Sequence, residues 1–165
     1  MKQRFAIVRA RFNDEITAAL LDGALRGFAD VAGGETRVDI SEVPGAFELP
    51  LAAKWLAESG DYAAVVCLGC VIRGETPHFD FVAGEAARGI AQVSLESGVP
   101  VIFGVLTTDS AAQAWVRAGK RRRGLRSHAG KGSGGGNKGY EAALSAVAMA
   151  ELKSALPTRT HRPKR

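Results

Sequence analysis

One histidine stands where a side chain that exchanges protons would be useful. His78 follows an apolar run, residues 63–71, and a short polar stretch, residues 72–77. The charge of a histidine changes near neutral pH, so this residue could act as a general acid or base. The position also suits a helix-capping or partly buried structural histidine, and it leaves both interpretations equally open. His128 and His161 lie in basic stretches, where a solvated surface position is expected.

The polar stretch before His78 also suits an anion. Arg73-Gly74-Glu75-Thr76 leads into a predicted helix, where unpaired backbone N–H groups and a nearby hydroxyl can hold a phosphate. Many loops between a strand and a helix contain Gly and Thr without binding anything, so this stretch alone is weak evidence. Arg117, at the end of a later helix, could add a charge-assisted contact. Otherwise it is a solvated arginine that the helix dipole favours.

Two other strand ends carry side chains suited to a ligand. Phe12 follows the first predicted strand in a polar setting, where an aromatic ring can stack on a planar heterocycle. Ala46-Phe47-Glu48 follows the second predicted strand. Glu48 could accept hydrogen bonds from a polyol, whereas Phe47 is expected to belong to the core or to a cavity wall.

Cys67 and Cys70 form a C-x-x-C pattern, but it lies inside a predicted strand. Residues three apart on a strand point to opposite faces and cannot easily form a disulfide. Without a second cysteine pair the pattern is not a zinc site, and no metal is expected. Two buried free cysteines are predicted. The glycines of residues 130–139 lack the spacing of a phosphate-binding P-loop and follow no strand.

The elements that must position these residues follow from the alternation of apolar runs and amphipathic segments. Strands are predicted at residues 4–10, 35–42, 63–71 and 101–107. Helices are predicted from Asn13 or Asp14 to 29, through Phe47, Leu51, Ala52, Trp55 and Leu56 up to Gly60, at 78–97, from Asp109 or Ser110 to 118, and at 138–156. Gly33-Gly34 is expected to end the first helix, and Pro157 the last, whose inward residues are expected to be Leu144, Val147, Ala148 and Leu152.

Such strand–helix units predict an α/β fold, a three-layer α/β/α sandwich with a four-stranded parallel sheet. The expected strand order is 2-1-3-4, as in flavodoxin-like folds, with the run 63–71 central because it is apolar almost throughout. Ligands bind at the carboxyl ends of strands in such sheets. The segments to consider are therefore 11–13, 43–48, 70–78 and 107–109. One domain is predicted over residues 1–157, with no internal repeat beyond these units.

The charge of the chain is unevenly placed. The 165 residues carry a formal charge of +5, and the excess lies in a basic Gly-rich segment, residues 119–136, and a basic tail, residues 158–165. Both are interpreted as solvated loop and tail, so no nucleic-acid partner is expected. No secretory signal or membrane span is recognised, which makes a cytoplasmic location the expectation. A hydrophobic fraction of 46% and a charged fraction of 24% are ordinary for a globular chain, which excludes disorder for the bulk of it.

The strand-end segments together resemble the lumazine synthase family in order and spacing. The residues that carry the resemblance are Arg11-Phe12-Asn13, Val43-Pro44-Gly45-Ala46-Phe47-Glu48-Leu49-Pro50, Gly69-Cys70-Val71-Ile72-Arg73-Gly74-Glu75-Thr76-Pro77-His78-Phe79-Asp80, Phe103-Gly104-Val105-Leu106-Thr107-Thr108, Gln113-Ala114 with Arg117, and Asn137-Lys138-Gly139.

The resemblance implies a transferase of riboflavin biosynthesis that joins a ribitylamino-pyrimidine to 3,4-dihydroxy-2-butanone 4-phosphate without a cofactor. His78 would be the general acid or base. The residues implied for the pyrimidine and its ribityl chain are Phe12, Ala46, Phe47, Glu48, Cys70, Val71, Ile72, Phe103 and Lys138. Those implied for the phosphate are Glu75, Thr76 and Arg117. In the family Phe103 and Arg117 come from a neighbouring subunit, so the resemblance implies a homo-oligomer with its active site at an interface.

The segment 119–136 departs from the family, which joins its last two helices through a turn shorter by about a dozen residues. Because that turn takes part in packing pentamers into sixty-subunit shells, a homopentamer is favoured over the shell. Cys70 replaces a residue that is commonly small or hydroxylated. A catalytically silent relative acting as a binding or assembly protein is one alternative, and a riboflavin synthase of the archaeal type is another. The joint presence of Phe12, Glu48, His78 and Arg117 favours the lumazine enzyme.

Overall fold

The computed structural model describes residues 3–31, 36–119 and 136–157. Its four parallel strands are β1 (Arg4–Ala10), β2 (Arg37–Val43), β3 (Ala64–Ile72) and β4 (Val101–Thr108). They lie in the order β2-β1-β3-β4, which confirms the predicted sheet. The boundaries of β1 agree with the predicted ones, and those of the other three strands differ from the predicted ones by at most two residues.

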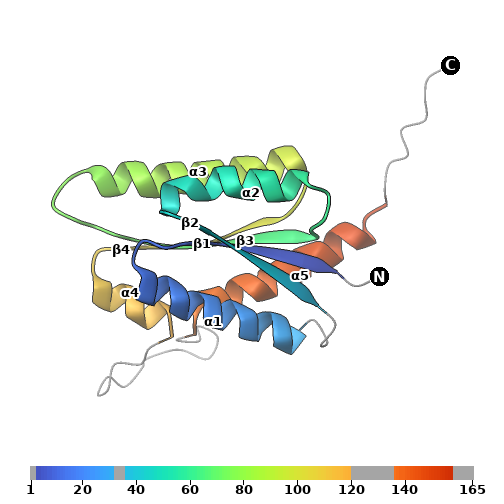
Figure 1. Cartoon of the computed structure of the whole chain (residues 1–165), viewed down its shortest axis with the longest axis horizontal. Coiled ribbons are helices and arrows are strands. Elements are labelled where there is room, and N and C mark those ends of the chain that lie inside the picture. The colour runs from blue at the N-terminus through green and yellow to red at the C-terminus, as the bar shows by residue number, and fades with distance from the viewer. Residues whose placement is uncertain (1–2, 32–35, 120–135, 158–165) are drawn as a thin grey trace.

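Helices cover both faces of the sheet, which confirms the three-layer α/β/α sandwich (Figure 1). The helices are α1 (Asp14–Val31), α2 (Leu49–Glu58), α3 (His78–Ser97), α4 (Ala111–Arg117) and α5 (Lys138–Ala155). In Figure 1, α2 and α3 lie above the sheet, and α1, α4 and α5 lie below it. A 3-10 turn, η1 (Ala46–Glu48), leads into α2.

Local capping explains several helix boundaries. The Ser110 hydroxyl accepts a hydrogen bond from the Gln113 N–H at 3.2 Å, so Ser110 and not Asp109 caps α4. Gly98 ends α3 with a positive φ of 63°, which glycine adopts without a Cβ penalty. The prediction that Gly33-Gly34 ends the first helix lies outside the described residues, as do residues 120–135 and 158–165.

Strand β3 is central, as its apolar sequence predicts. From Ala64 to Leu68 every residue is fully buried, because helices cover it on both faces. One face packs against α1 and α5 and the other against α2 and α3. The carboxyl ends of β1, β2 and β3 therefore emerge from a rigid layer that can hold side chains in place.

The prediction for the inward face of α5 is partly wrong. Val147 is buried, but Ala148 and Leu152 are exposed, and Leu144 is half-buried. The buried face consists mainly of small residues, Gly139, Ala142, Ala143, Ala146 and Ala150. Small residues lie there because α1 and α5 approach closely: a Cβ on Gly27 would lie 2.8 Å from the Ala143 Cβ.

The helix predicted through residues 47–60 is present as η1 and α2, but its apolar residues are not all buried. Leu49, Ala52 and Ala53 are buried, whereas Leu51 is 53% and Trp55 65% exposed. On α3, Phe81 is likewise 69% exposed. Large apolar side chains thus lie on the outer surface of α2 and α3. Within residues 3–31, 36–119 and 136–157, no helix has the length and apolar character that a membrane span requires.

Candidate functional site

His78 is the first residue of α3 and is exposed. Pro77 occupies the N-cap position, and no side chain caps this helix. The His78 side chain makes no hydrogen bond or ion pair with the described residues. It is therefore neither a helix cap nor a buried structural histidine, and its ring is accessible for proton exchange.

The loop before His78 is held by Arg73. The guanidinium lies 3.1 Å from the Asp80 carboxylate of α3 and 3.2 Å from that of Asp109, which follows β4. It also lies 4.2 Å from the centre of the Phe79 ring. The hydrogen bond that Arg73 donates to Asp80, and then the one that it donates to Asp109, raise the pKa of Arg73 above its usual range despite partial desolvation. Arg73 therefore ties this loop to β4.

Glu75 and Thr76, two of the three residues implied for phosphate binding, lie in this loop and are exposed. Their backbone leads directly into the N-terminus of α3. Because Arg73 is engaged by two carboxylates, a phosphate bound at this loop would need a further cation.

The loop after β1 is tied to both neighbouring strands. The Phe12 N–H donates to the Pro44 carbonyl at 3.0 Å, beyond the end of β2. The Asn13 amide donates to the Cys70 carbonyl of β3 at 2.8 Å, and Asn13 adopts a positive φ of 57°. Phe12 is left 70% exposed, so its ring presents a face to solvent. The sequence predicted Asn13 as a possible cap and missed this bridge.

A hollow of about 660 Å³ lies beside Phe12, at the ends of β1 and β2. Its lining includes Asp14 and Glu42, and the side chain of Arg9 holds both carboxylates. Arg9 is 8% exposed, and its Nη2 lies 2.8 Å from Asp14 and 2.6 Å from Glu42. Sequence analysis missed this cluster. In the register of β1 and β2, Arg9 lies opposite Glu42. A basic and an acidic residue at matching positions of two predicted neighbouring strands could have indicated this pair.

The turn η1 places the three residues after β2 differently. Ala46 is 6% exposed, whereas Phe47 is 57% exposed, so Phe47 does not belong to the core. Glu48 is exposed, and its Oε2 lies 3.2 Å from where a Cβ on Gly45 would be. The absence of a side chain at Gly45 thus gives the Glu48 carboxylate room beside the turn.

At the end of β3, Cys70 differs from its neighbours. It is 2% exposed, and burial raises the pKa of its thiol to about 11. Val71 and Ile72 are half-buried. Cys67 packs on the opposite face of the sheet, and burial raises its pKa to about 12. Both cysteines are free and buried, as predicted.

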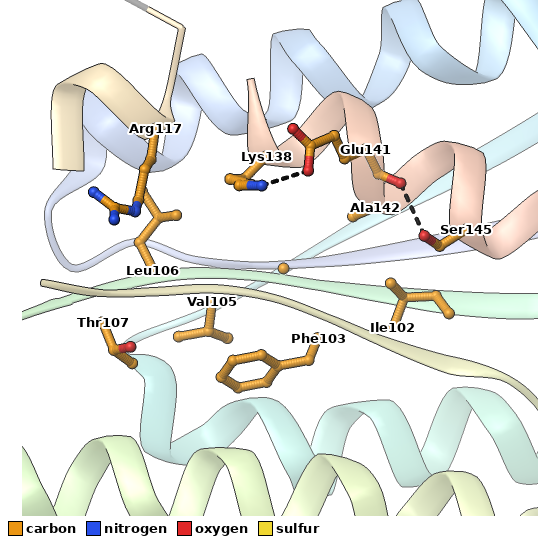
Figure 2. Close-up of a pocket in the computed structure, with 11 residues that line it drawn as sticks. Ile102, Phe103, Val105, Leu106, Thr107, Arg117, Lys138, Glu141, Ala142 and Ser145 are labelled. Carbon is orange, nitrogen blue, oxygen red and sulfur yellow. Dashed lines mark hydrogen bonds and ion pairs between the residues drawn. The ribbon is translucent and has the colours of Figure 1, made fainter. Parts of the chain in front are cut away.

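A second cavity, of about 360 Å³, lies along β4. Its lining combines three residues implied by the family resemblance, Phe103 from β4, Arg117 from α4 and Lys138 from α5. Figure 2 shows Arg117 and Lys138 on the α5 side of β4, while the Phe103 ring points to the other side. Lys138 pairs with Glu141 at 2.5 Å. Arg117 has no ion pair with the described residues, so its charge is available to an anion.

The expected site residues thus fall into two groups. One group, with Phe12, Glu48 and His78, lies at the ends of β1, β2 and β3. The other, with Phe103 of β4 and Arg117 of α4, lies beside β4, which has β3 as its single neighbour among the described strands. The cavity beside β4 and the hollow beside Phe12 share no lining residue. The described part of the chain contains no group of three or more His, Cys, Asp or Glu that could hold a metal ion.

Comparison with known families gives a match over most of the chain. A family model described as 6,7-dimethyl-8-ribityllumazine synthase matches residues 2–154. The match contains every described strand and reaches the last turn of α5. Both groups of candidate site residues lie inside it.

Proposed function

The chain belongs to the 6,7-dimethyl-8-ribityllumazine synthase family, and we propose that it condenses 5-amino-6-(D-ribitylamino)uracil with 3,4-dihydroxy-2-butanone 4-phosphate. The product is 6,7-dimethyl-8-ribityllumazine, which places the enzyme at the penultimate step of riboflavin biosynthesis. The observation that carries the proposal is the family match over residues 2–154, which includes every strand-end segment of the candidate site.

The reaction requires proton transfers and the departure of phosphate. The 5-amino group of the pyrimidine adds to the ketone, and loss of water gives an imine. Elimination then breaks the C–O bond to phosphate, and the ribitylamino nitrogen closes the ring with loss of a second water. Holding both substrates in register supplies much of the acceleration. Donors around the departing phosphate stabilise its charge.

In this proposal Phe12 stacks on the pyrimidine, and its 70% exposed ring supports that role. Glu48 accepts hydrogen bonds from the ribityl chain, beside Ala46 and Phe47. Val71 and Ile72 line the ring edges. The buried Cys70 thiol takes no part as a side chain, so any contact there is made by the backbone.

His78 exchanges protons with the reacting nitrogen and oxygen atoms, and its exposure at the start of α3 supports this role. Glu75, Thr76 and the N-terminus of α3 hold the phosphate from one side. Arg117 supplies the cation that Arg73 cannot, because Arg73 is already held by Asp80 and Asp109.

A complete site needs two chains in this proposal. The first chain contributes Phe12, Glu48 and His78, and a neighbouring chain contributes Phe103, Arg117 and Lys138 from its β4 edge. The separation of the two groups supports this arrangement. The exposed Leu51 and Trp55 also support it, because large apolar patches commonly mark protein interfaces. The single domain over residues 1–157 assembles as a pentamer, a form favoured over the sixty-subunit shell by the segment 119–136.

The direct test mixes the purified protein with both substrates and follows lumazine absorbance together with phosphate release. Both signals should rise faster than in the uncatalysed mixture. In a His78→Ala variant kcat should fall by about ten- to hundredfold, since water reaches the exposed site and replaces part of the lost proton transfer. His161→Ala, in the tail, is the matched control and should keep the full rate. Wild-type rates equal to the uncatalysed rate would contradict the proposal.

A second test separates the two halves of the site. Arg117→Ala should raise the KM for the sugar phosphate by about tenfold or more and leave the KM for the pyrimidine within about twofold. Arg88→Ala is the matched control, because Arg88 is an exposed arginine of α3 that pairs with Glu85 away from both groups. Equal effects of the Arg117 variant on both substrates would contradict its assignment.

Native mass measurement tests the assembly. A pentamer of the 17.3 kDa chain has a mass of about 87 kDa. A monomeric mass with full activity would contradict the shared site, and a sixty-subunit mass would contradict the preference for the pentamer.

A further inference from the structure

We propose that Asn137 is a positioning residue for the half of the site that contains Arg117 and binds phosphate. Because Asn137 holds this half in place, the position of Arg117 does not depend on the length of the segment 120–135. The inference rests on the proposed function, because it assigns to Asn137 the placement of Arg117. Asn137 lies at the N-cap of α5, next to Lys138, and is 7% exposed.

Four hydrogen bonds hold the Asn137 side chain, two through each end of the amide. Its Nδ2 donates to the Ala19 carbonyl of α1 at 2.6 Å and to the Ala118 carbonyl at 2.8 Å. Its Oδ1 accepts from the backbone N–H groups of Gly139 at 2.8 Å and Tyr140 at 3.2 Å. One end of the amide therefore caps α5, and the other end joins α4 to α1.

Glycines around Asn137 fix its place. A Cβ on Gly23 would lie 2.0 Å from the Asn137 Oδ1, and a Cβ on Gly139 would lie 1.9 Å from the Leu20 carbonyl oxygen. Gly119 has a positive φ of 89°, and a Cβ there would lie 3.2 Å from the Asn137 Cβ. Because backbone and amide approach so closely, the side chain has little space in which to shift.

The two ends of the Asn137 amide hold the backbone beside two different cations. Arg117 is the last residue of α4, a helix of seven residues, and the next residue is Ala118, whose carbonyl receives the Asn137 bond. Lys138 is the first residue of α5, which the Oδ1 end caps. The Nδ2 end therefore positions Arg117, and the Oδ1 end positions Lys138. Figure 2 shows both cations at the same cavity.

The same contact brings Gly119 and Asn137, the described residues near the two ends of the segment 120–135, close together. A Cβ on Gly119 would lie 3.6 Å from the Asn137 Cα, so the two Cα atoms are within about 5 Å, given a bond of about 1.5 Å. Residues two apart in a chain span a similar distance. The described residues Gly119 and Asn137 thus lie side by side, and the number of residues between them need not alter the placement of Arg117.

The test uses Asn137→Ser, because serine is a good N-cap but cannot also reach Ala19 and Ala118. The KM for the sugar phosphate should rise by about tenfold, while the KM for the pyrimidine stays within about twofold, since α5 keeps its cap. Asn137→Ala loses both ends of the amide and should raise both KM values. If the serine variant does not fold, Asn137→Thr tests the same split.

Ser110→Ala is the control for general destabilisation, because it removes the N-cap of α4 and leaves the Asn137 bonds in place. It should change neither KM by more than about twofold. Deletion of residues 122–133 should also leave both KM values within about twofold. An Asn137→Ser variant without the selective rise would overturn the positioning role, and a selective rise after the deletion would overturn the separation from the segment.

Failure of the proposed function is recognised separately, as a wild type that turns over no substrate. The inference is then tested by the affinity of the wild type and of Asn137→Ser for inorganic phosphate, measured by titration calorimetry. The serine variant should bind about tenfold more weakly. Equal affinities, or no binding by the wild type, would overturn the inference.

Discussion

Asn13 offers a direct test of how the loop after β1 is held beside the sheet. Its amide donates to the Cys70 carbonyl at 2.8 Å, and its backbone has a φ of 57°. Asn13→Ala removes the hydrogen bond and places a residue with an ordinary Cβ in the left-handed region. Asn13→Gly removes the same bond but tolerates that backbone. The two variants therefore separate the bond from the backbone conformation.

The expected magnitudes follow from the geometry. The β1–β3 ladder ends at the pair of Arg9 and Leu68, so the Asn13 amide satisfies a carbonyl beyond the ladder. Losing that bond at the 2% exposed Cys70 should lower the free energy of unfolding by about 1–2 kcal/mol. Glycine adds about 0.5 kcal/mol through the entropy of the unfolded chain. Alanine adds about 1–2 kcal/mol for its left-handed backbone.

The glycine variant should thus lose about 2 kcal/mol and the alanine variant about 3 kcal/mol. Urea unfolding at one fixed protein concentration measures both values, since an assembly makes stability depend on concentration. Steady-state kinetics should show a higher KM for the pyrimidine in both variants, because Phe12 is the neighbour of Asn13. A glycine variant as stable as the wild type would refute the reasoning, because the Cys70 bond would then contribute nothing.

Two further predictions concern stability. Arg9→Met keeps the apolar stem but leaves the neighbouring carboxylates of Asp14 and Glu42 without their shared cation, so urea unfolding should show a loss of about 1–2 kcal/mol, less than for a fully buried pair. An unchanged midpoint would contradict it. The pKa values of Cys67 and Cys70 are raised from 9.0 to about 12 and 11. Above pH 9 the unfolded thiols lose protons that the folded thiols keep, so stability should fall by up to about 1.4 kcal/mol per pH unit for each thiol until those values are reached. Unfolding from pH 8 to 11 measures this slope, and the double alanine variant should lose it.

The fold could be predicted because its signals are local. Apolar runs separated by amphipathic segments predicted every described strand within one or two residues. The rule of right-handed crossovers then favoured a doubly wound sheet, and the order expected for it is the one observed. The two cysteines could be assigned to opposite faces because the side chains of a strand alternate.

The bridges at the site could not be predicted in this way. The hydrogen bond between Asn13 and Cys70 joins residues 57 positions apart, and the one between Asn137 and Ala19 joins residues 118 apart. Asparagine is common at turns and caps, so its sequence context predicts a local role. Whether the amide instead reaches a distant carbonyl depends on how closely the elements pack. Glycine positions such as Gly23 and Gly139 decide that distance.

The exposed apolar residues of α2 could not be distinguished from its buried ones in the sequence, and the proposed assembly gives a reason. A surface helix with one buried face has one apolar stripe, and periodicity identifies it. A helix that packs on its own sheet and also on a second chain is apolar on two sides, so periodicity cannot tell which residues face which partner. Leu49 and Ala53 face the sheet of their own chain, while Leu51 and Trp55 are exposed. In the proposed assembly a second chain covers Leu51 and Trp55. The apolar spacing of α2 then reflects two interfaces, one with its own sheet and one with the second chain.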